Sequence, residues 1–465
     1  MGAVTVNKVA EVSAQYLAEL DENAVPSGYK QTEVGVIPED WDVENLQKLT
    51  VLIIDGTHHT PRYTTYGVPF LRVTDIQGEL DDSEFKYVSE EEHAYLIRRC
   101  RPQKGDLLLS KNGTIGIPKV VSWEWEFSIF VSLALIKLKK NLLEVNYLEQ
   151  FFKSDFLDLQ LAQRAKQGTV TNLHLEEIRE ILIPLPRNKE EQTAIANALS
   201  DVDALISELE KLIAKKQSIK TATMQQLLTG RTRLPQFALR EDGSKKGYKQ
   251  SELGEIPEDW DVVTLGEICN FENGDRSSNY PSAHEFVEYG VSFINAGHVA
   301  DGLIDLRYMD YIPEHVYERL GGGKVAAGDV LFCLRGSLGK FGVVPEEFGS
   351  GAIASSLVII RPKKHRTTTD YVSVYFKSEF SKEMITLWAG GAAQPNLGAR
   401  ELANFLVPLS SKEEQGCIAT ILSDMDTEIQ ALQQRLTKTR QIKQGMMQEL
   451  LTGKTRLIQP AGSTN

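Results

Sequence analysis

The fold of this chain is decided by a stretch of sixteen residues that occurs twice. Residues 28–43 are GYKQTEVGVIPEDWDV, and residues 247–262 are GYKQSELGEIPEDWDV. Thirteen of the sixteen positions are identical, and the two copies start 219 positions apart (247 − 28). A period of this length is far longer than the repeat unit of a solenoid. The pair therefore predicts a duplicated domain rather than a stack of small repeats.

Other short motifs return in the same order and at nearly the same spacing. These motifs are GDLLL at 105–109 and GDVLF at 328–332, KEEQ at 189–192 and at 412–415, and LLTGRTRL at 227–234 with LLTGKTRL at 450–457. Two copies of one module thus account for most of the chain.

The copies differ most in residues 51–100 and 270–325, which share little that can be aligned by eye. A repeated frame around divergent loops predicts one scaffold that presents two different recognition surfaces. Neutral drift after duplication is the alternative, although drift should have eroded the helix start KEEQ as fast as the loops.

The composition is that of a globular protein with more than one domain. The chain has 465 residues, of which 42% are hydrophobic and 25% charged, with no uninterrupted apolar run long enough for a membrane span. The N-terminus lacks the compact apolar block of a secretory signal, so we expect a cytoplasmic protein. The four cysteines form no Cys-x-x-Cys pair, which fits a reducing compartment and predicts no zinc site. The net charge of −13 removes a whole-chain electrostatic argument for nucleic acid but leaves local patches open.

Each module is expected to consist of a compact α+β domain followed by one long helix. Short β-like runs bounded by glycine alternate with apolar helical patterns, such as those at 147–164 and 371–388. The predicted segments are an N-terminal extension (1–27), a first globular domain (28–187), a first long helix (188–230), a linker (231–246), a second globular domain (247–410), a second long helix (411–453) and a C-terminal tail (454–465).

The two long helices are predicted to pack against each other as an antiparallel coiled coil. No proline or glycine occurs between Asn188 and Thr229, and apolar residues step by three and four in both copies. The seam residues are Leu199, Val202, Ile206, Leu209 and Ile213 in the first helix and Leu422, Met425, Ile429, Leu432 and Leu436 in the second. Pairing of each helix with another protein is the alternative.

The ends of the helices carry capping signals. Residues 411–414 (Ser-Lys-Glu-Glu) fit a capping box, in which the serine accepts the N3 amide and Glu414 reaches back. Gly230 and Gly453 are expected to be left-handed C-caps. Gly453-Lys454-Thr455 resembles the end of a phosphate-binding loop, but Gln448 stands where that motif needs its first glycine, so we interpret it as a helix cap.

No motif for bond chemistry occurs in the chain. It has no Pro-Pro for an adenine methyltransferase loop, no G-x-G-x-x-G after a strand, no H-E-x-x-H and no G-x-S-x-G. Asp106 with Lys111, and Asp329 with Lys340, lack the second acid that a metal-dependent nuclease needs. We therefore expect a non-catalytic binding protein with no metal or cofactor of its own. The alternatives are a self-contained nuclease or methyl-transferring enzyme, and a coiled-coil scaffold without DNA affinity.

Polar residues in loops that contain glycine or proline are the candidates for DNA binding. Such loops offer donors, acceptors and stacking rings for base edges, and amides beside glycine suit a phosphate. The candidates are Thr57, His58, His59, Arg62, Tyr63, Arg72, Lys111, Asn112, Arg164, Lys166 and Gln167 in the first copy, and Arg276, Asn279, Tyr280, His298, Arg335, Ser337, Gln394, Asn396 and Arg400 in the second. The structural alternatives are side chains that only fix a turn, and plain hairpin turns.

The ordered set of motifs resembles the specificity subunit of type I restriction-modification systems. The resemblance lies in GYKQTEVGVIPEDW, the loop DGTHHTP, the segment GDLLLSKNGTIG, the Glu-Glu-Gln helix start and the LLTG ending, and it covers about residues 28–457.

The resemblance implies a fold and a set of partners. The fold would be two target-recognition domains, each binding one half of a bipartite DNA sequence, and an antiparallel pair of spacer helices. The partners would be double-stranded DNA, two methyltransferase subunits and restriction subunits. S-adenosylmethionine, ATP and magnesium would belong to those partner subunits. Residues 1–27 lie outside the clearest match, and Val9, Val12, Tyr16 and Leu20 fit one amphipathic helix.

Overall fold

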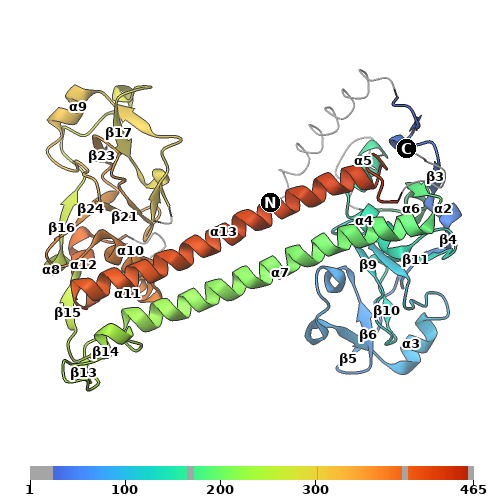
Figure 1. Cartoon of the computed structure of the whole chain (residues 1–465), viewed down its shortest axis with the longest axis horizontal. Helices are drawn as coiled ribbons and strands as arrows, with labels where there is room; N and C mark the ends of the chain where they lie inside the picture. The colour runs from blue at the N-terminus through green and yellow to red at the C-terminus, as the bar shows by residue number, and fades with distance from the viewer. Residues whose placement is uncertain (1–24, 165–171, 301, 390–395, 459–465) are drawn as a thin grey trace. The chain divides into compact units, whose positions relative to one another are not determined.

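The chain folds into two units, each of which combines parts that are far apart in the sequence. The computed structural model describes residues 25–164, 172–300, 302–389 and 396–458 (Figure 1). By internal contacts, unit 1 consists of residues 1–210 and 435–465, and unit 2 of residues 211–434. The boundary falls inside both long helices, so the last part of the second helix belongs with the domain of the first copy. The expected helix over residues 9–20 lies outside the described residues.

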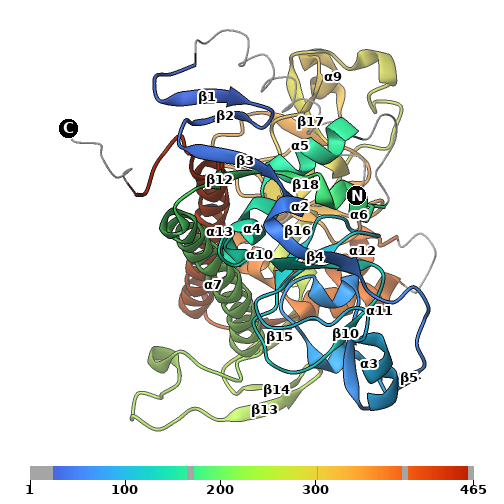
Figure 2. The ribbon, with the colours of Figure 1, turned by 90° about the vertical axis from the view of Figure 1, so that its right-hand side faces the viewer.

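Unit 1 is an α+β domain built around two four-stranded sheets. Within its described residues the strand orders are β4-β11-β8-β9 and β10-β6-β7-β5, while β1 pairs with β2 and β3 with β12 (Figure 2). The strands are β1 (Tyr29–Thr32), β2 (Gly35–Pro38), β3 (Trp41–Asn45), β4 (Thr50–Asp55), β5 (Tyr63–Thr64), β6 (Val68–Leu71), β7 (Lys86–Val88), β8 (Leu107–Ser110), β9 (Pro118–Val120), β10 (Ser128–Ile129), β11 (Leu133–Leu138) and β12 (Leu182–Pro186). The short helices are α2 (Leu46–Leu49), α3 (Glu90–Leu96), α4 (Val145–Phe152), α5 (Asp155–Arg164) and α6 (Leu175–Arg179).

Unit 2 repeats this topology almost element for element. Its strand orders are β16-β24-β21-β22 and β20-β17-β23, with β13 paired to β14, β15 to β25 and a short β18-β19 hairpin. The strands are β13 (Tyr248–Ser251), β14 (Gly254–Pro257), β15 (Asp261–Thr264), β16 (Cys269–Asn273), β17 (Val291–Ile294), β18 (Val299–Ala300), β19 (Leu303–Ile304), β20 (Asp310–Ile312), β21 (Val330–Cys333), β22 (Phe341–Val343), β23 (Gly351–Ile353), β24 (Leu357–Pro362) and β25 (Leu406–Leu409). The short helices are α8 (Leu265–Ile268), α9 (Glu314–Arg319), α10 (Thr369–Lys377), α11 (Glu379–Ala389) and α12 (Ala399–Ala403).

The divergent stretches therefore share a fold that their sequences conceal. β6 and β17 are equivalent: each pairs antiparallel with the strand before a short helix and parallel with β10 or β23. Residues 51–100 and 270–325 share little in sequence, but their strands pair in the same way. The physical reason is that buried strands need only apolar residues of suitable size, so different residues form the same sheet.

The central sheet is buried on both faces, which explains its continuous apolar runs. In unit 1, Leu107 and Leu109 of β8 belong to the core that the helices cover, whereas Leu108 between them belongs to the core under the second sheet. Successive side chains of a strand point to opposite faces, so both faces must be apolar. The strand runs expected from the sequence at GDLLL and GDVLF are confirmed.

The two helical patterns expected over 147–164 and 371–388 are each divided into two helices. The hydroxyl of Ser154 donates to the Phe151 carbonyl at 2.5 Å, and that of Ser378 donates to the Tyr375 carbonyl at 2.6 Å. A serine that satisfies a helix-end carbonyl competes with continuation of the helix. The apolar period continues through each break, and for this reason the sequence pattern did not reveal it.

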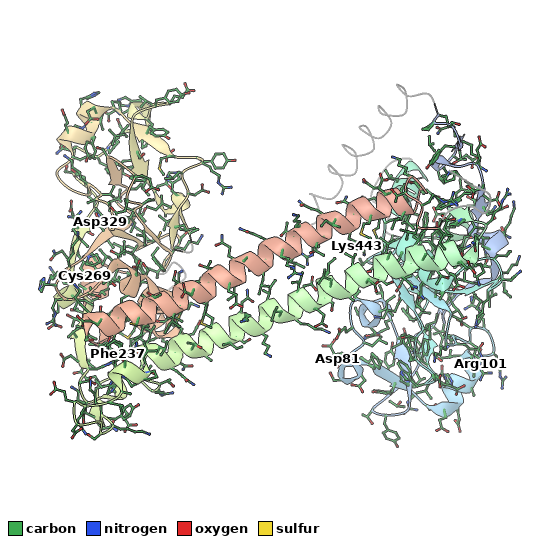
Figure 3. All side chains as sticks on the ribbon, viewed as in Figure 1. Asp81, Arg101, Phe237, Cys269, Asp329 and Lys443 are labelled. Atoms are coloured by element: carbon green, nitrogen blue, oxygen red, sulfur yellow. The ribbon has the colours of Figure 1, made fainter. Side chains whose placement is uncertain are left out.

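The long helices are α7 (Lys189–Leu228) and α13 (Lys412–Leu450), and they pack antiparallel within each unit. In unit 1, Lys443 of α13 (labelled in Figure 3) pairs with Asp203 of α7 at 2.6 Å, and Arg440 pairs with Glu210 at 2.5 Å. From Asp203 to Glu210 the residue number rises along α7, while that of the partner falls from Lys443 to Arg440 along α13. The two helices are therefore antiparallel.

The same direction holds in unit 2, where Lys216 pairs with Glu428 at 2.7 Å and Lys220 with Asp426. Every seam residue expected from the sequence is buried or half-buried, with Leu199 and Leu422 the most deeply buried of the ten. Leu199 belongs to the hydrophobic core of unit 1 and Leu422 to that of unit 2. The antiparallel pairing of the helices is confirmed, whereas the role of the ten residues as one continuous seam stays a prediction.

The caps at the helix ends are partly as expected. Gly230 and Gly453 have φ values of 67° and 68°, which confirms both left-handed C-caps. The Glu414 amide donates to the Ser411 hydroxyl at 3.3 Å, as a capping box requires. The second half of the expected box is wrong, because the Glu414 carboxylate binds Arg233 at 2.8 Å instead of returning to Ser411. A guanidinium offers this carboxylate a charge-assisted hydrogen bond, which is stronger than one from a neutral amide.

Candidate nucleic-acid interface

In unit 1 the first candidate loop starts at the end of β4 and is fixed there by a glycine. A Cβ added at Gly56 would lie 2.0 Å from the Ile129 carbonyl oxygen, so only glycine fits. The Thr57 amide donates to the same carbonyl at 3.1 Å, and the Phe130 amide donates to the Leu71 carbonyl at 3.0 Å. These contacts hold the start of the loop beside the last residue of β6.

A buried carboxylate beneath this loop gathers three basic groups. The side chain of Asp55 is 5% exposed, and it lies 2.7 Å from Arg99, 3.2 Å from His58 and 3.3 Å from Lys111. Burial raises the pKa of Asp55, but the hydrogen bonds from Arg99, His58 and Lys111 outweigh burial, so its pKa is lowered. Because Arg99 and His58 remain 49% and 65% exposed, the cluster presents basic groups at the surface.

Two of the predicted residues in this loop serve mainly to hold its shape. The hydroxyl of Thr57 lies 2.8 Å from Nδ1 of His59, and Nε2 of His59 lies 3.3 Å from Glu92 on α3. The His59 ring also contacts Tyr95, with ring centroids 6.4 Å apart. The turn-fixing alternative therefore describes Thr57 and His59, whereas His58 contacts Asp55 beneath the loop and keeps most of its side chain exposed.

The remaining residues of the first copy differ in what they offer. Arg62 and Tyr63 are exposed, and the Tyr63 ring packs edge-on against Phe70 at 5.8 Å. Arg72 is half-buried and pairs with Asp75 through two hydrogen bonds of 3.0 and 2.8 Å, so its charge is neutralised inside the domain.

The turn after β8 brings two further candidates to the same place. Lys111 is buried against Asp55, so it supports the cluster rather than standing free for a phosphate. Asn112 forms a β-bridge with Asn172, and the Leu173 amide donates to the Lys111 carbonyl at 2.7 Å. The side chain of Arg164, together with Lys166, Gln167 and, in the second copy, Gln394, lies outside the described residues.

Unit 2 places two predicted arginines together at the equivalent position. Arg276 and Arg335 both donate to the Ser355 carbonyl, at 3.1 and 2.8 Å, and both side chains are exposed. The Leu397 amide donates to the Leu334 carbonyl at 3.0 Å, so the exposed Asn396 lies beside the Arg335 turn. Three segments that are distant in the sequence thus form one basic surface.

The other predicted residues of unit 2 have mixed roles. Tyr280 packs edge-on against Phe293 at 5.7 Å, as Tyr63 does against Phe70 in unit 1. His298 is buried and accepts the Asn295 amide at 3.1 Å. The carbonyl of Asn279 accepts from Arg319, Ser337 is half-buried in the β21–β22 turn, and Arg400 is exposed on α12.

Sequence reasoning missed Asp55 and Arg99 in this site. Arg99 lies in a stretch of the first copy that cannot be aligned with the second copy. No neighbouring residue indicates that its side chain contacts Asp55, 44 positions earlier. Within the described residues there is no cluster of three or more metal-ligating side chains, and no helix is long and apolar enough to cross a membrane.

Comparison with known proteins identifies the family. Residues 38–221 and 257–441 each match the type I restriction modification DNA specificity domain. A provisionally named specificity subunit of the type I restriction enzyme MjaX, from Methanocaldococcus jannaschii, is 30% identical over 438 residues, which cover 92% of this chain and 97% of that protein.

Two solved structures share the fold. The S subunit of the type I restriction-modification system from M. genitalium matches with a TM-score of 0.54 and 16% identity, over 92% of this chain and 98% of that one. A chain from work on complex assembly and conformational transition of the type I R-M system also gives a TM-score of 0.54, with 16% identity, over 90% of this chain and 99% of that one. The duplicated matches and the full-length relative lead to one conclusion: the chain belongs to the family of type I restriction-modification specificity subunits and carries two DNA specificity domains.

Proposed function

We propose that the chain recognises an asymmetric, bipartite DNA sequence, with one half-site bound by residues 28–187 and the other by residues 247–410. One observation carries the proposal: the same scaffold holds different polar groups at the same place in the two units. His58 and Arg99 lie there in unit 1, and Arg276 with Arg335 in unit 2. The two units therefore offer DNA different polar groups on one frame, and we propose that the divergent loops around these groups contact the base edges of two different half-sites.

The negative charge of the chain supports a role for partner subunits in DNA binding. The formal net charge is −13, so the chain as a whole repels DNA, while each proposed DNA-binding surface contains only a few basic groups. We propose that methyltransferase subunits supply much of the phosphate neutralisation. The isolated chain would then bind DNA weakly at physiological salt.

The proposed complex contains two methyltransferase subunits, with restriction subunits added for cleavage, and it acts in the cytoplasm. In this proposal the chain itself is not catalytic and holds no cofactor. S-adenosylmethionine, ATP and magnesium would be bound by the partner subunits. The relative that is named as a specificity subunit of a restriction enzyme supports this assignment.

The helix pair would act as the spacer between the half-sites. Helices of 40 and 39 residues rise about 1.5 Å per residue, and paired helices are stiffer than a single one. A protein that binds two separated half-sites needs a stiff connection of fixed length. The number of base pairs between the half-sites sets the distance that this connection must span.

Exchange of one divergent region tests the bipartite proposal. Replacing residues 51–180 with the corresponding region of another family member is expected to change one half of the methylated sequence and leave the other half unchanged. The measurement is mapping of methylated adenines in cells that carry the exchanged chain with its methyltransferase. A change in both halves would contradict independent recognition by the two domains.

The paired arginines of unit 2 are expected to contact phosphate. Arg276→Ala or Arg335→Ala should weaken binding by the assembled complex similarly for all sequences, and should reduce the slope of log affinity against log salt by about one. The measurement is a DNA titration at several salt concentrations. Arg240→Ala is the control, because Arg240 pairs with Glu258 elsewhere in unit 2, at 2.6 Å. Loss of affinity for one sequence alone would indicate base contact instead.

A further inference from the structure

Two tyrosines occupy the same exposed position in the two units. Tyr66 is 83% exposed and Tyr289 is 80% exposed. Each is followed by Gly-Val, and this valine is the first residue of an equivalent strand, β6 or β17. Both lie in the stretches where the two copies otherwise diverge. A single exposed aromatic residue needs no explanation, but the same ring at the same place in two divergent loops does.

The backbone beside each tyrosine is fixed by a glycine. A Cβ added at Gly67 would lie 2.3 Å from the Val88 carbonyl oxygen, and one added at Gly290 would lie 2.4 Å from that of Ile312. Both carbonyls belong to the last residue of the neighbouring strand, β7 or β20. Each tyrosine is therefore attached to a rigid strand start, which lowers the entropy lost when its ring binds a partner.

The same strand carries the basic surface at its other end. In unit 1, Leu71 at the end of β6 accepts the Phe130 amide, next to the loop that holds His58 over Asp55. In unit 2, the carbonyl of Ile294 at the end of β17 accepts the Ala354 amide at 2.7 Å. Ser355 follows Ala354, and its carbonyl accepts from both arginines. In both units, an exposed tyrosine thus lies before one end of the strand and basic groups lie beyond the other end. We call this arrangement the bracket.

The length of that strand matches a short stretch of DNA. Four residues at about 3.3 Å each span about 13 Å. Stacked base pairs rise about 3.4 Å each, so the strand alone matches about four base pairs, and the bracket, which extends past both ends of the strand, covers at least that number. A tyrosine presents a flat apolar face and a hydroxyl donor, which suit contact with a base or sugar and with a phosphate oxygen.

We propose that Tyr66 and Tyr289 each contact duplex DNA at the edge of one half-site, at least about four base pairs from the basic groups of the same unit. The inference rests on the proposed function and adds to it the residues that delimit each half-site. The ring packs against the nucleotide, and the basic groups hold the backbone at the other end of the strand. Each tyrosine acts on the half-site of its own domain.

The test uses the complete complex with its methyltransferase subunits and a duplex that carries the methylated sequence mapped in cells. Tyr66→Ala is expected to weaken binding about 5- to 150-fold, which corresponds to about 1–3 kcal/mol for the loss of one aromatic contact. Tyr66→Phe should keep most of the affinity. Tyr289→Ala should act in the same way, and base changes in only the other half-site should retain their full effect in each variant. Val51→Ala, which alters another exposed side chain of unit 1, is the control.

A direct readout is photocrosslinking with 5-iodouracil placed in turn along each half-site. Crosslinks to Tyr66 are expected in one half-site and to Tyr289 in the other, at the outer position of the bracket. Unchanged affinity of both alanine variants together with no crosslink would overturn the inference. Failure of the alanine variants to assemble with the methyltransferase subunits would also overturn it, because the tyrosines would then face protein. If the unaltered complex fails to discriminate the mapped duplex, the proposed function itself is wrong, so the two failures are distinguishable.

Discussion

Arg233→Ala is expected to destabilise unit 2 by about 3–5 kcal/mol, because it leaves a buried carboxylate without its charged partner. The side chains of Arg233 and Glu414 are 6% and 2% exposed. Arg233 donates to Glu414 at 2.8 and 2.9 Å, and it also pairs with Asp259 at 2.8 Å. Trp260 donates its indole N–H to the same Glu414 at 3.0 Å, so the loss would disturb the aromatic centre of the unit as well.

The control for this change is Arg240→Ala, which removes a partly exposed pair with Glu258 and should cost less than about 1 kcal/mol. Urea unfolding followed by circular dichroism measures both. Arg456→Ala should reproduce the large effect in unit 1, where Arg456 binds the buried Glu191 and also Asp40. Equal small losses for Arg233 and Arg240 would show that the buried pair contributes nothing.

The same network makes the stability of unit 2 depend on pH in the acid range. Burial raises the pKa of Asp259, but hydrogen bonds from Arg233 and Lys246 outweigh burial and lower its pKa from 3.8 to about 2. Since the folded value lies below the unfolded value, the contribution of Asp259 is fully present above about pH 4 and is lost as pH falls towards 2. Arg233→Ala should therefore flatten the pH dependence of unit 2 in this window.

Gly453→Ala is expected to destabilise unit 1 by about 2–5 kcal/mol. The residue has φ 68°, which costs a side chain about 1–2 kcal/mol. The added Cβ would also lie 2.5 Å from the Pro38 ring and 3.1 Å from Trp41, and overpacking of this kind costs about 1–3 kcal/mol more.

Gly445→Ala is the matched control on the same helix. Gly445 lies inside α13, and an added Cβ would meet nothing within 4 Å. Alanine should therefore stabilise the helix by about 0.5–1 kcal/mol. The two substitutions add the same methyl group eight residues apart, so opposite signs in thermal unfolding are expected. A loss of stability for both would indicate that the contact between Gly453 and Pro38 is not the cause.

The sequence by itself determined the duplication, the α+β class, the long helices and the apolar face of each. Each of these is encoded locally: the repeat by identity between copies, the helices by a 3.6-residue period without proline, and the C-caps by glycine at the required position. Of the residues proposed from the sequence, His58 lies at the surface of unit 1, and Arg276 and Arg335 share one carbonyl acceptor in unit 2. Whether these residues contact DNA stays a prediction.

The sequence could not supply the contacts that depend on long-range packing. The Asp55 cluster joins residues 44 positions apart, and the buried Lys111 looks in the sequence like any lysine beside a glycine turn. The equivalence of β6 and β17 was also hidden, since buried positions accept many apolar side chains while the exposed loops carry different polar ones.

Only the tertiary structure decided which helix end belongs to which domain. The LLTG motif of the second copy caps its helix beside the GYKQ hairpin of the first copy, where the Tyr29 hydroxyl donates to the Gly453 carbonyl at 3.2 Å. In the second hairpin, Tyr248 makes the same contact with Gly230 at 3.2 Å. Because the hairpins and the helix ends are nearly identical in the two copies, sequence complementarity allows either pairing. A helix of 40 residues is about 60 Å long, so its end cannot return to the domain in which it begins, and helix length therefore selects the exchanged arrangement.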